Sequence, residues 1–400
     1  MLKPVFLDST AQKLVEATER TNALLGVIAS SQKDAYLNDW DRISETVTSG
    51  LASKLFRPGD QLVDKWSDTA ASAQYDVPWG VRHFKNVELQ DGEIVPGMVL
   101  QWDYATPFGV QFSHPRAFLK CPEGLNSGTY FFTLGATWGK NCVQGDKVSF
   151  TVQGNHPEGV RVAGCYYAPD QEKSNWRIYV YSADGKEILE TIVPTFTASG
   201  YDLGTMGLNT RNGNLNSMQE MAYGWNRWKT SALRQWLNSD KTKGNWWVAQ
   251  DEWDIAPDQL TTKDGFLRGM PEKLLKAIKP TKIVTYTNTV QDGGEADVTY
   301  DKIFIPSLQE MHINPQISGE GETWDYWLRA SQQSAPLSQG QTYPQMITYA
   351  VENHTSPQHV RLRSAIRNGA HNVCVVTNFG NVNSDSTSRD YRVAPACVIC

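Results

Sequence analysis

The stretch YGWNRWKTSALRQWLN, residues 223–238, carries the strongest indication of a fold. Its tryptophans recur at helical spacing. Its arginines and asparagines are typical of a loop-rich domain in which indole rings fill a small core and guanidinium groups tie loops together. We therefore expect a compact domain over residues 201–400. Its core is predicted to contain Trp225, Trp228 and Trp236, for which a sugar-stacking platform is the alternative role. Arg234 and Arg329 are expected to pair with buried carboxylates or backbone carbonyls.

Residues 1–54 have helical character. Small and apolar residues recur there at a 3-4-3-4 spacing, at Leu14, Ala17, Thr21, Leu24 and Ile28. Such a heptad seam buries its stripe against other helices. Two interpretations stay open: a surface helix packed on its own chain, or a short coil that attaches and oligomerises the protein, as a homotrimer. A second helix is predicted to bury the face formed by Trp40, Ile43, Val47 and Leu51.

Residues 55–200 lose the helical period and show short apolar or alternating runs separated by Gly, Pro, Asn and Asp. Many short strands with turn residues at this spacing predict an antiparallel β-sandwich. Asp184-Gly185 indicates a hairpin between two of the strands. The predicted strands are Val95–Trp102, Thr129–Leu134, Val148–Val152, Val160–Tyr167, Trp176–Tyr181 and Ile188–Val193.

Charge and composition exclude some partners. The formal net charge is -6 and no Lys/Arg run occurs, so we expect no nucleic-acid partner. No apolar stretch reaches the roughly 18 residues of a membrane span, so no membrane insertion is expected. The N-terminus lacks the pattern of a signal peptide, which predicts synthesis in the cytoplasm and release by lysis or within a particle.

The six cysteines are predicted to be reduced thiols of the core, because they show no second C-x-x-C motif and hence no zinc spacing. A contact between Cys374 and Cys397 on adjacent strands is one further expectation.

No motif for a common enzyme class is present. The chain has no P-loop, no dinucleotide fingerprint, no nucleophile elbow and no H-E-x-x-H, so we expect no catalytic residue, cofactor or metal. His354 and His359 could form a metal pair, but a solvated polar loop is the favoured interpretation. Glu320, Glu322 and Asp325 could serve a glycan hydrolase or bind calcium. A solvated loop or a salt bridge to Arg329 is favoured for them.

Four phrases carry a resemblance: the block beginning at Tyr223, GFLRG at 265–269, DKIFIPS at 301–307, and the ending from Leu362-Arg363-Ser364 to Ala394-Pro395-Ala396. Together they resemble a domain family of unassigned function that recurs in prophage proteins, often among virion structural genes. That domain is similar in layout to the C-type-lectin and formylglycine-generating-enzyme fold. The resemblance covers about residues 200–400. Arg361 stands where a Trp-Leu-Arg phrase is expected, and the catalytic cysteine pair of the enzymes is missing, so oxidase chemistry is not expected.

The same fold carries the variable proteins of diversity-generating retroelements, which vary exposed residues near the C-terminus. Residues 368–391 are crowded with Asn, Ser, Asp, Thr and Tyr, the residues that adenine-directed variation favours. Two interpretations stay open for this segment: a hypervariable surface or an ordinary polar loop.

Together these features predict an α+β multidomain protein of a virion surface: a helical attachment segment at 1–54 that also contacts other virion proteins, a β-sandwich spacer at 55–200, and a C-type-lectin-like head at 201–400. The head is expected to bind a host-surface glycan or protein through the long polar segments 332–360 and 378–391, which exceed ordinary loop lengths. A capsid or tail decoration protein and a glycan hydrolase are the alternatives. The candidate ligand-binding residues are Tyr343, Tyr349, His354, Asn378, Asn381, Asn383, Asp385 and Tyr391.

Overall fold

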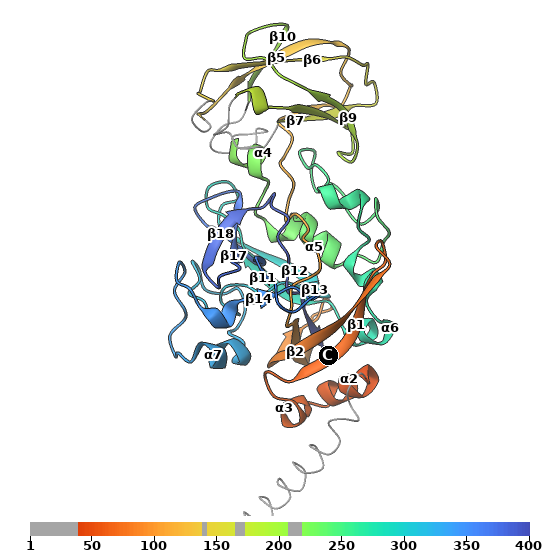
Figure 1. Ribbon diagram of the computed structural model, residues 1–400, viewed down its shortest axis with the longest axis vertical. Coiled ribbons are helices and arrows are strands. Elements are labelled where there is room, and N and C mark those ends of the chain that lie inside the picture. Colours follow the sequence, from red (N-terminus) through yellow and green to blue (C-terminus); the bar gives the residue numbers. More distant parts are fainter. Residues whose placement is uncertain (1–38, 138–141, 165–172, 207–217) are drawn as a thin grey trace, which may run out of the picture.

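The computed structural model describes residues 39–137, 142–164, 173–206 and 218–400. The predicted heptad seam lies outside these residues. Strands outnumber helices, and the fold is β-rich with several cores. Figure 1 shows two bodies stacked along the long axis. We call residues 39–116 and 224–400 the main body and residues 117–223 the inserted lobe.

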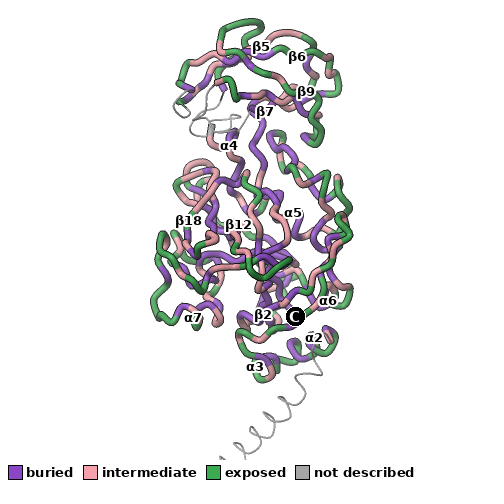
Figure 2. The backbone as a smooth tube through the Cα atoms, viewed as in Figure 1, coloured by how far each residue is buried: buried purple, intermediate pink, exposed green. Residues whose placement is uncertain are grey.

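The main body is built on a sheet that joins the two ends of the described chain. Strands β1 (Gln61–Asp68), β2 (Ala73–Glu88) and β3 (Ile94–Trp102) form an antiparallel meander. The last strand, β19 (Ala396–Ile399), pairs with β3, and β13 (Ile303–Phe304) pairs with β19. The sheet order is therefore β1-β2-β3-β19-β13. The buried stretches of the chain gather around this sheet in Figure 2.

This sheet differs from the predicted division of the chain at residue 55. Strand β3 was expected to belong to a middle domain, but Val99 and Leu100 pair with Val398 and Cys397 instead. All four side chains are buried in one core together with residues of the C-terminal half. The physical reason is that β3 would otherwise expose an unpaired edge and an apolar face, and β19 covers both.

Short helices cover the sheet. Helix α2 (Trp40–Thr48) is capped by Asp39 and buries Trp40, Ile43 and Val47, while α3 (Ala52–Leu55) follows it. Leu51, predicted on the same face, is exposed because the helix has already ended and Gly50 turns with a φ of 72°. Two more helices pack on the body: α5 (Ala232–Leu237) and α6 (Glu272–Ala277).

The tryptophan block forms core, as its helical spacing predicts. Trp225, Trp228 and Trp236 are 0–6% exposed, and each indole N–H has a partner. Arg234 donates to the buried carboxylate of Asp301 (2.7 Å), which confirms that prediction. Arg329 is exposed and makes no ion pair with any residue that the structure describes, so the pairing predicted for it is wrong.

The remaining strands of the main body form small sheets. Strands β11 (Thr281–Tyr286) and β12 (Ala296–Asp301) pair, β14 (Thr348–Tyr349) pairs with β15 (Pro357–Gln358), and β16 (Val360–Ala365), β17 (Asn372–Val376) and β18 (Val382–Ser386) form a third sheet. The predicted loop 378–391 thus contains a strand. Cys374 and Cys397 lie in different sheets, so the predicted contact across adjacent strands is wrong.

The inserted lobe has two sheets around one core. Strands β5 (Gly128–Leu134), β6 (Lys147–Val152) and β10 (Tyr201–Met206) form one sheet. The other contains β4 (Leu119–Cys121), β7 (Val160–Gly164), β8 (Ile178–Ser182) and β9 (Ile188–Ile192). Five of the predicted strands lie in this lobe and are present, although residues 165–167 of one lie outside the described residues, and the Asp184-Gly185 hairpin is present too. One pairing is not antiparallel, because β10 runs parallel to β5.

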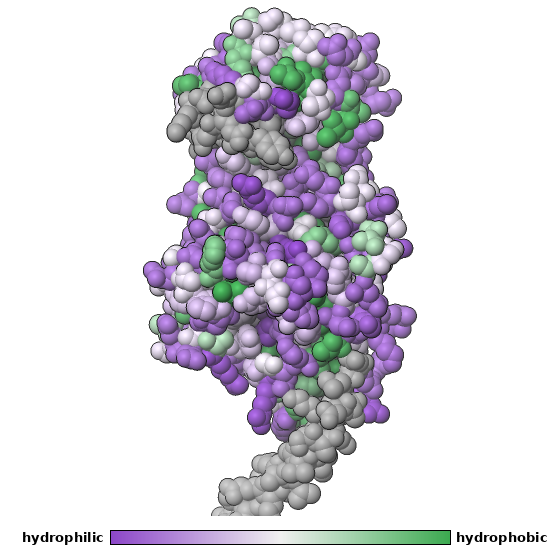
Figure 3. Space-filling view, viewed as in Figure 1, coloured by the Kyte–Doolittle hydropathy of each residue, from purple (hydrophilic) through white to green (hydrophobic). Residues whose placement is uncertain are grey.

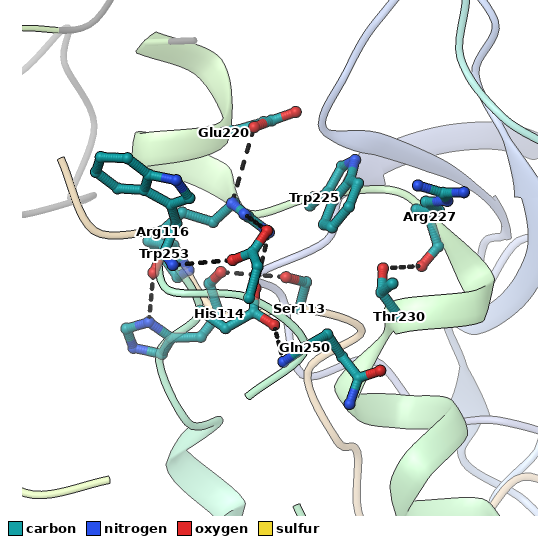
Figure 4. A network of polar contacts seen from close by, with 12 residues as sticks. Ser113, His114, Arg116, Glu220, Trp225, Arg227, Thr230, Gln250 and Trp253 are labelled. Atoms are coloured by element: carbon teal, nitrogen blue, oxygen red, sulfur yellow. Dashed lines mark hydrogen bonds and ion pairs between the residues drawn. The ribbon is translucent and has the colours of Figure 1, made fainter. Parts of the chain in front are cut away.

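Two crossings of the chain join the lobe to the main body. Arg116 lies in the first crossing, and α4 (Met218–Tyr223) forms the second. The fully buried guanidinium contacts three carboxylates, those of Asp254 (2.7 Å), Asp251 and Glu220 (3.8 Å), and lies 4.4 Å from the Trp225 ring (Figure 4). Burial alone would lower the pKa of Arg116, but the three carboxylates outweigh it and raise that pKa. The lobe lies at the opposite end of the molecule from α2 (Figure 1), so it does not separate the N-terminal segment from the main body as a spacer would.

None of the helices in the described part of the chain combines the length and apolar character that crossing a lipid bilayer requires. The face seen in Figure 3 is mostly hydrophilic, with scattered apolar patches.

Candidate ligand-binding site

A polar cavity lies where the sheet meets the loops of the C-terminal half. Gln61 at the start of β1, Gly80 in β2 and Gln101 near the end of β3 are aligned across three strands. Beside them a cavity of about 250 Å³ opens to the surface. Its lining includes Gln61, Gln101, Asp103, Tyr326, Trp327 and Thr348. Tyr326 and Trp327 come from α7 (Asp325–Ser331), so residues far apart in sequence share this site.

The buried side chain of Arg82 lies next to the cavity. The residue is 3% exposed, and its guanidinium carbon lies 4.0 Å from the ring centre of Tyr326. It donates to the carboxylate of Asp103 and, through Nε, to the amide oxygen of Gln101 (3.1 Å). Asp103 also accepts a hydrogen bond from Gln61. The guanidinium therefore ties the polar side chains of β1 and β3 into one network.

Gly80 makes room for this network. A Cβ atom at this position would lie 2.1 Å from Nη1 of Arg82 and 2.4 Å from the Asp103 carboxylate. Such distances do not occur between real atoms, so any side chain at residue 80 would displace the ion pair. Because residue 80 of the middle strand has no side chain, Arg82 and Asp103 can lie across the strand at that position.

The amide of Gln101 has only one workable orientation. Its oxygen accepts from Nε of Arg82 (3.1 Å) and from the indole N–H of Trp327 (3.3 Å). Neither donor can accept a hydrogen bond, so the oxygen must face them and the NH₂ group must face the other way. No described residue accepts from that NH₂ group, although Gln101 is only 2% exposed and lines the cavity. An oriented donor therefore faces the cavity.

Backbone hydrogen bonds hold the walls in place. The amide of Ala105 donates to the carbonyl of Tyr349 (2.8 Å), and that of Val351 donates back to Ala105 (3.1 Å). On the other side, Asp103 donates from its amide to Pro78 (3.0 Å). These bonds hold residues 103–105 against β2 and β14, so this wall of the cavity is fixed by the protein itself.

An aromatic ledge borders the cavity. The imidazole of His354 stacks on Tyr104 with ring centres 4.1 Å apart and planes 11° apart. His354 has a φ of 59°, a left-handed conformation that its turn imposes, because Asn353 accepts from the amides of Thr355 and Ser356. Tyr104 lines the cavity and Tyr349 is exposed close by.

The predicted binding residues fall into separate places. Tyr349 and His354 lie beside the cavity. Tyr343 lies elsewhere and packs partly on the core, where its hydroxyl accepts from the Ser338 amide (2.8 Å). Asn381 donates to the Gly340 carbonyl (2.9 Å), and Asn378 lies in the same β17–β18 turn.

The other predicted residues belong to β18 and the segment after it. Asn383 is exposed on β18. Asp385 accepts from the hydroxyl of Tyr391 at 2.5 Å, and burial together with this bond raises the pKa of Tyr391 to about 12. His359 stacks on Tyr391 (4.9 Å). These side chains serve the packing of the small sheet.

The residues that line the cavity were not singled out from the sequence. Gln61, Gln101 and Asp103 lie in segments assigned to a different domain, and Tyr326 lies in a helix of the C-terminal half. One signal was present: Gln101 interrupts the apolar run Met98–Trp102, and a polar side chain inside a buried strand needs a partner or a ligand.

The three carboxylates weighed for hydrolase chemistry are not grouped around a cavity. Glu320 is 3% exposed and accepts from the Tyr286 amide (2.8 Å) and the Ser364 hydroxyl. Burial raises the pKa of Glu320, although Arg363 opposes this. Glu322 and Asp325 flank His83, at 3.4 and 3.1 Å from its ring nitrogens. Glu320 is therefore a structural group with no path to a substrate.

Within the described ranges, no group of three or more His, Cys, Asp and Glu side chains is arranged to hold a metal ion. His354 and His359 stack on different tyrosines and do not form a pair.

Comparison with known proteins gives one finding. Residues 203–400 match the model of a protein family described as a domain of unknown function, DUF6273. No curated protein and no solved structure matches the chain. The cavity straddles the limit of this match, because Gln61, Gln101 and Asp103 precede it while Tyr326, Trp327 and Thr348 lie within it. The matched region alone therefore carries only part of the site.

Proposed function

We propose that the protein is a virion surface protein that binds a glycan on the host cell, and that the cavity between β3 and α7 is its binding site. The observation that carries the proposal is the Gln101 amide, which Arg82 and Trp327 orient so that its NH₂ group faces an open polar cavity. A donor of fixed orientation in the wall of a concave site selects a ligand that can accept from it, which is how a few placed polar groups give such sites their specificity.

The chemistry of the lining favours a sugar over a protein surface. Gln61, Gln101 and Asp103 offer amide and carboxylate groups, and Tyr326 and Trp327 offer aromatic carbon. Sugars present hydroxyl groups at their edges and C–H groups on their faces, so both kinds of wall find a counterpart. A concave site with a few placed polar groups among aromatic residues is typical of small-ligand recognition.

The rest of the proposal concerns assembly. We place the protein in the virion, with the segment before α2 attaching it to other virion proteins and forming a homotrimer, and with the main body adopting a C-type-lectin-like fold. The inserted lobe is taken as a β-sandwich. Several copies per particle would turn weak single contacts into strong attachment, because linked sites bind with a high effective concentration.

The test uses the labelled full-length protein on candidate bacterial cells. One portion of the cells is treated with periodate, which cleaves sugars that carry neighbouring hydroxyls, and another with protease. Binding that is lost after periodate and kept after protease supports the proposal. Binding lost only after protease indicates a protein receptor. Absence of binding to every candidate host, with the protein present in particles, favours a decoration role.

A further inference from the structure

We infer that the cavity takes one neutral sugar ring through two neighbouring hydroxyl groups, one accepting from Gln101 and the next donating to Asp103. This inference rests on the proposed function and adds the class of ligand. Gln101 lies in β3 and Asp103 follows the end of that strand, and both side chains accept from the guanidinium of Arg82, so they lie close together. Both line the cavity.

The donor half of the site is fixed by Arg82 and Trp327. Because both of these residues donate to the Gln101 oxygen, the NH₂ group cannot rotate to present an acceptor. A ligand atom that meets Gln101 must therefore be an acceptor. A sugar hydroxyl meets this requirement and keeps its own proton for a second bond.

The acceptor half is the carboxylate of Asp103. One of its oxygens accepts from Arg82 and the other from Gln61. Each carboxylate oxygen has a second lone pair, so both keep the capacity to accept from a ligand. The side chain of Asp103 is 17% exposed, enough to present that capacity to the cavity. A ligand atom here must be a donor, which a hydroxyl also is.

The charge of the walls disfavours an anionic ligand. Asp103 is the one charged residue among those that line the cavity. The nearby cation, Arg82, is 3% exposed, lies under Tyr326 and donates through Nε and Nη2 to Gln101 and Asp103, while its Nη1 is buried without a hydrogen-bond partner, so Asp103 is the charged group that a ligand meets first. A uronic acid, sialic acid or phosphate would place its negative charge against the carboxylate and would be repelled.

The size of the cavity limits the ligand to one ring. Its volume of about 250 Å³ lies below the range of roughly 300–1,000 Å³ that is usual for drug-sized ligands. Further sugar units of a chain would lie outside it, along the ledge of Tyr104 and His354.

The experiment measures binding of small sugars to the full-length protein by ligand-detected NMR and calorimetry. The neutral probes are the methyl glycosides of glucose, galactose and mannose, and the anionic probes are glucuronic acid and N-acetylneuraminic acid. We expect at least one neutral glycoside to bind and both anions to fail. Binding of an anion in preference to the neutral glycosides would overturn the inference.

The decisive variant is Gln101→Glu. The new carboxylate can still accept from Arg82 and Trp327, so the fold is expected to hold, but the group facing the cavity becomes an acceptor. Binding of the neutral glycoside should fall at least tenfold. Gln144→Glu in the inserted lobe adds the same charge at an exposed position far from the cavity and should bind as the unchanged protein does.

A second variant tests the acceptor half. Asp103→Asn replaces one acceptor oxygen by a donor and should also weaken binding at least tenfold, with thermal unfolding measured to show that the variant is folded. If cells bind in a periodate-sensitive manner while both variants bind like the unchanged protein, the glycan proposal stands and this inference fails. If no cell binds at all, the proposed function itself fails.

Discussion

The guanidinium of Arg82 in β2 lies under the ring of Tyr326 in α7, with its central carbon 4.0 Å from the ring centre. The contact joins the N-terminal sheet to a helix that begins more than two hundred residues later. A cation held over an aromatic face is attracted by the ring, and the attraction grows when water is excluded. The contact between Arg82 and Tyr326 therefore both shapes the cavity wall and holds distant parts of the chain together.

The first prediction concerns this tie. Tyr326→Ala should lower the free energy of unfolding by about 1–2 kcal/mol through loss of the cation–π contact, and it should weaken binding of any ligand of the cavity. Urea unfolding followed by tryptophan fluorescence measures the first effect. Tyr201→Ala removes a tyrosine that is 70% exposed on the inserted lobe and should change stability by less than about 0.5 kcal/mol. Equal losses of stability in the Tyr326→Ala and Tyr201→Ala variants would show that the cation–π contact does not stabilise the fold.

The second prediction concerns Gly80. In Gly80→Ala the new methyl group would lie 2.1 Å from Arg82 and 2.4 Å from Asp103, so the ion pair must move. Overpacking of this kind costs about 1–3 kcal/mol, and the displaced Asp103 should lose its alignment with Gln101. We expect a lower urea midpoint and weaker binding of the neutral glycoside.

The control for Gly80 is Gly128→Ala at the start of β5. Its new methyl group would meet only the side chain of Tyr130, at 3.6 Å, an ordinary contact. This variant should unfold and bind like the unchanged protein. A Gly80→Ala protein with normal binding would show that the Arg82–Asp103 pair does not shape the cavity.

Local signals predicted much of the secondary structure. The strands of the inserted lobe alternate or run apolar and are bounded by turn residues, so their positions follow from neighbours in sequence. Helix α5 is similar, since the hydroxyl of Ser231 accepts from the amide of Arg234 (3.1 Å) and the apolar residues recur at helical spacing.

Non-local pairing could not be predicted in this way. Nothing near Val99 in the sequence specifies that Val398 will be its partner, yet this pairing decides which half of the chain β3 belongs to. β18 shows the same effect in a polar segment: Asn383, Ser384 and Asp385 are poor strand formers, but pairing with β17 overrides their preference. The cavity was missed for the same reason, because Gln61, Gln101 and Tyr326 meet only in the folded chain.

The third prediction concerns the neck, by which we mean the two crossings of the chain between the main body and the inserted lobe. Arg116→Ala would remove the guanidinium that contacts Glu220, which is fully buried, and Asp254, whose side chain is 10% exposed. Removing one partner of a buried ion pair typically costs about 3–5 kcal/mol. We expect a loss of this order in urea unfolding and faster proteolysis of the chain at the neck.

Arg177→Ala is the matched control for Arg116. Among the described residues, the guanidinium of Arg177 donates only to the carbonyls of Ser174 and Trp176, close by in sequence. Its removal should cost less than about 1 kcal/mol and should leave proteolysis of the neck unchanged. An Arg116→Ala protein as stable as the Arg177→Ala protein would mean that the three carboxylates are solvated.

The fourth prediction concerns acid sensitivity through His371. Burial lowers the pKa of His371 from 6.5 to about 4 in the folded chain, although Asp385 opposes this shift. Between these two pH values the unfolded chain binds a proton at this residue that the folded chain does not. The free energy of unfolding is therefore complete above pH 6.5 and is lost as the pH falls toward 4, by as much as about 3 kcal/mol from this residue.

His371→Phe tests this directly, because a phenyl ring can keep the stack on Tyr223, whose ring centre lies 5.0 Å away, but cannot bind a proton. We expect unfolding measured by urea at a series of pH values to show a smaller loss between pH 7 and pH 4 for the variant than for the unchanged protein. Tyr223→Phe keeps both the stack and the histidine, so it should keep the full pH dependence whatever its effect on stability at pH 7. The carboxylates titrate in all three proteins and cancel in the comparison. Identical slopes for the His371→Phe variant and the unchanged protein would therefore show that the imidazole reaches water in the folded state.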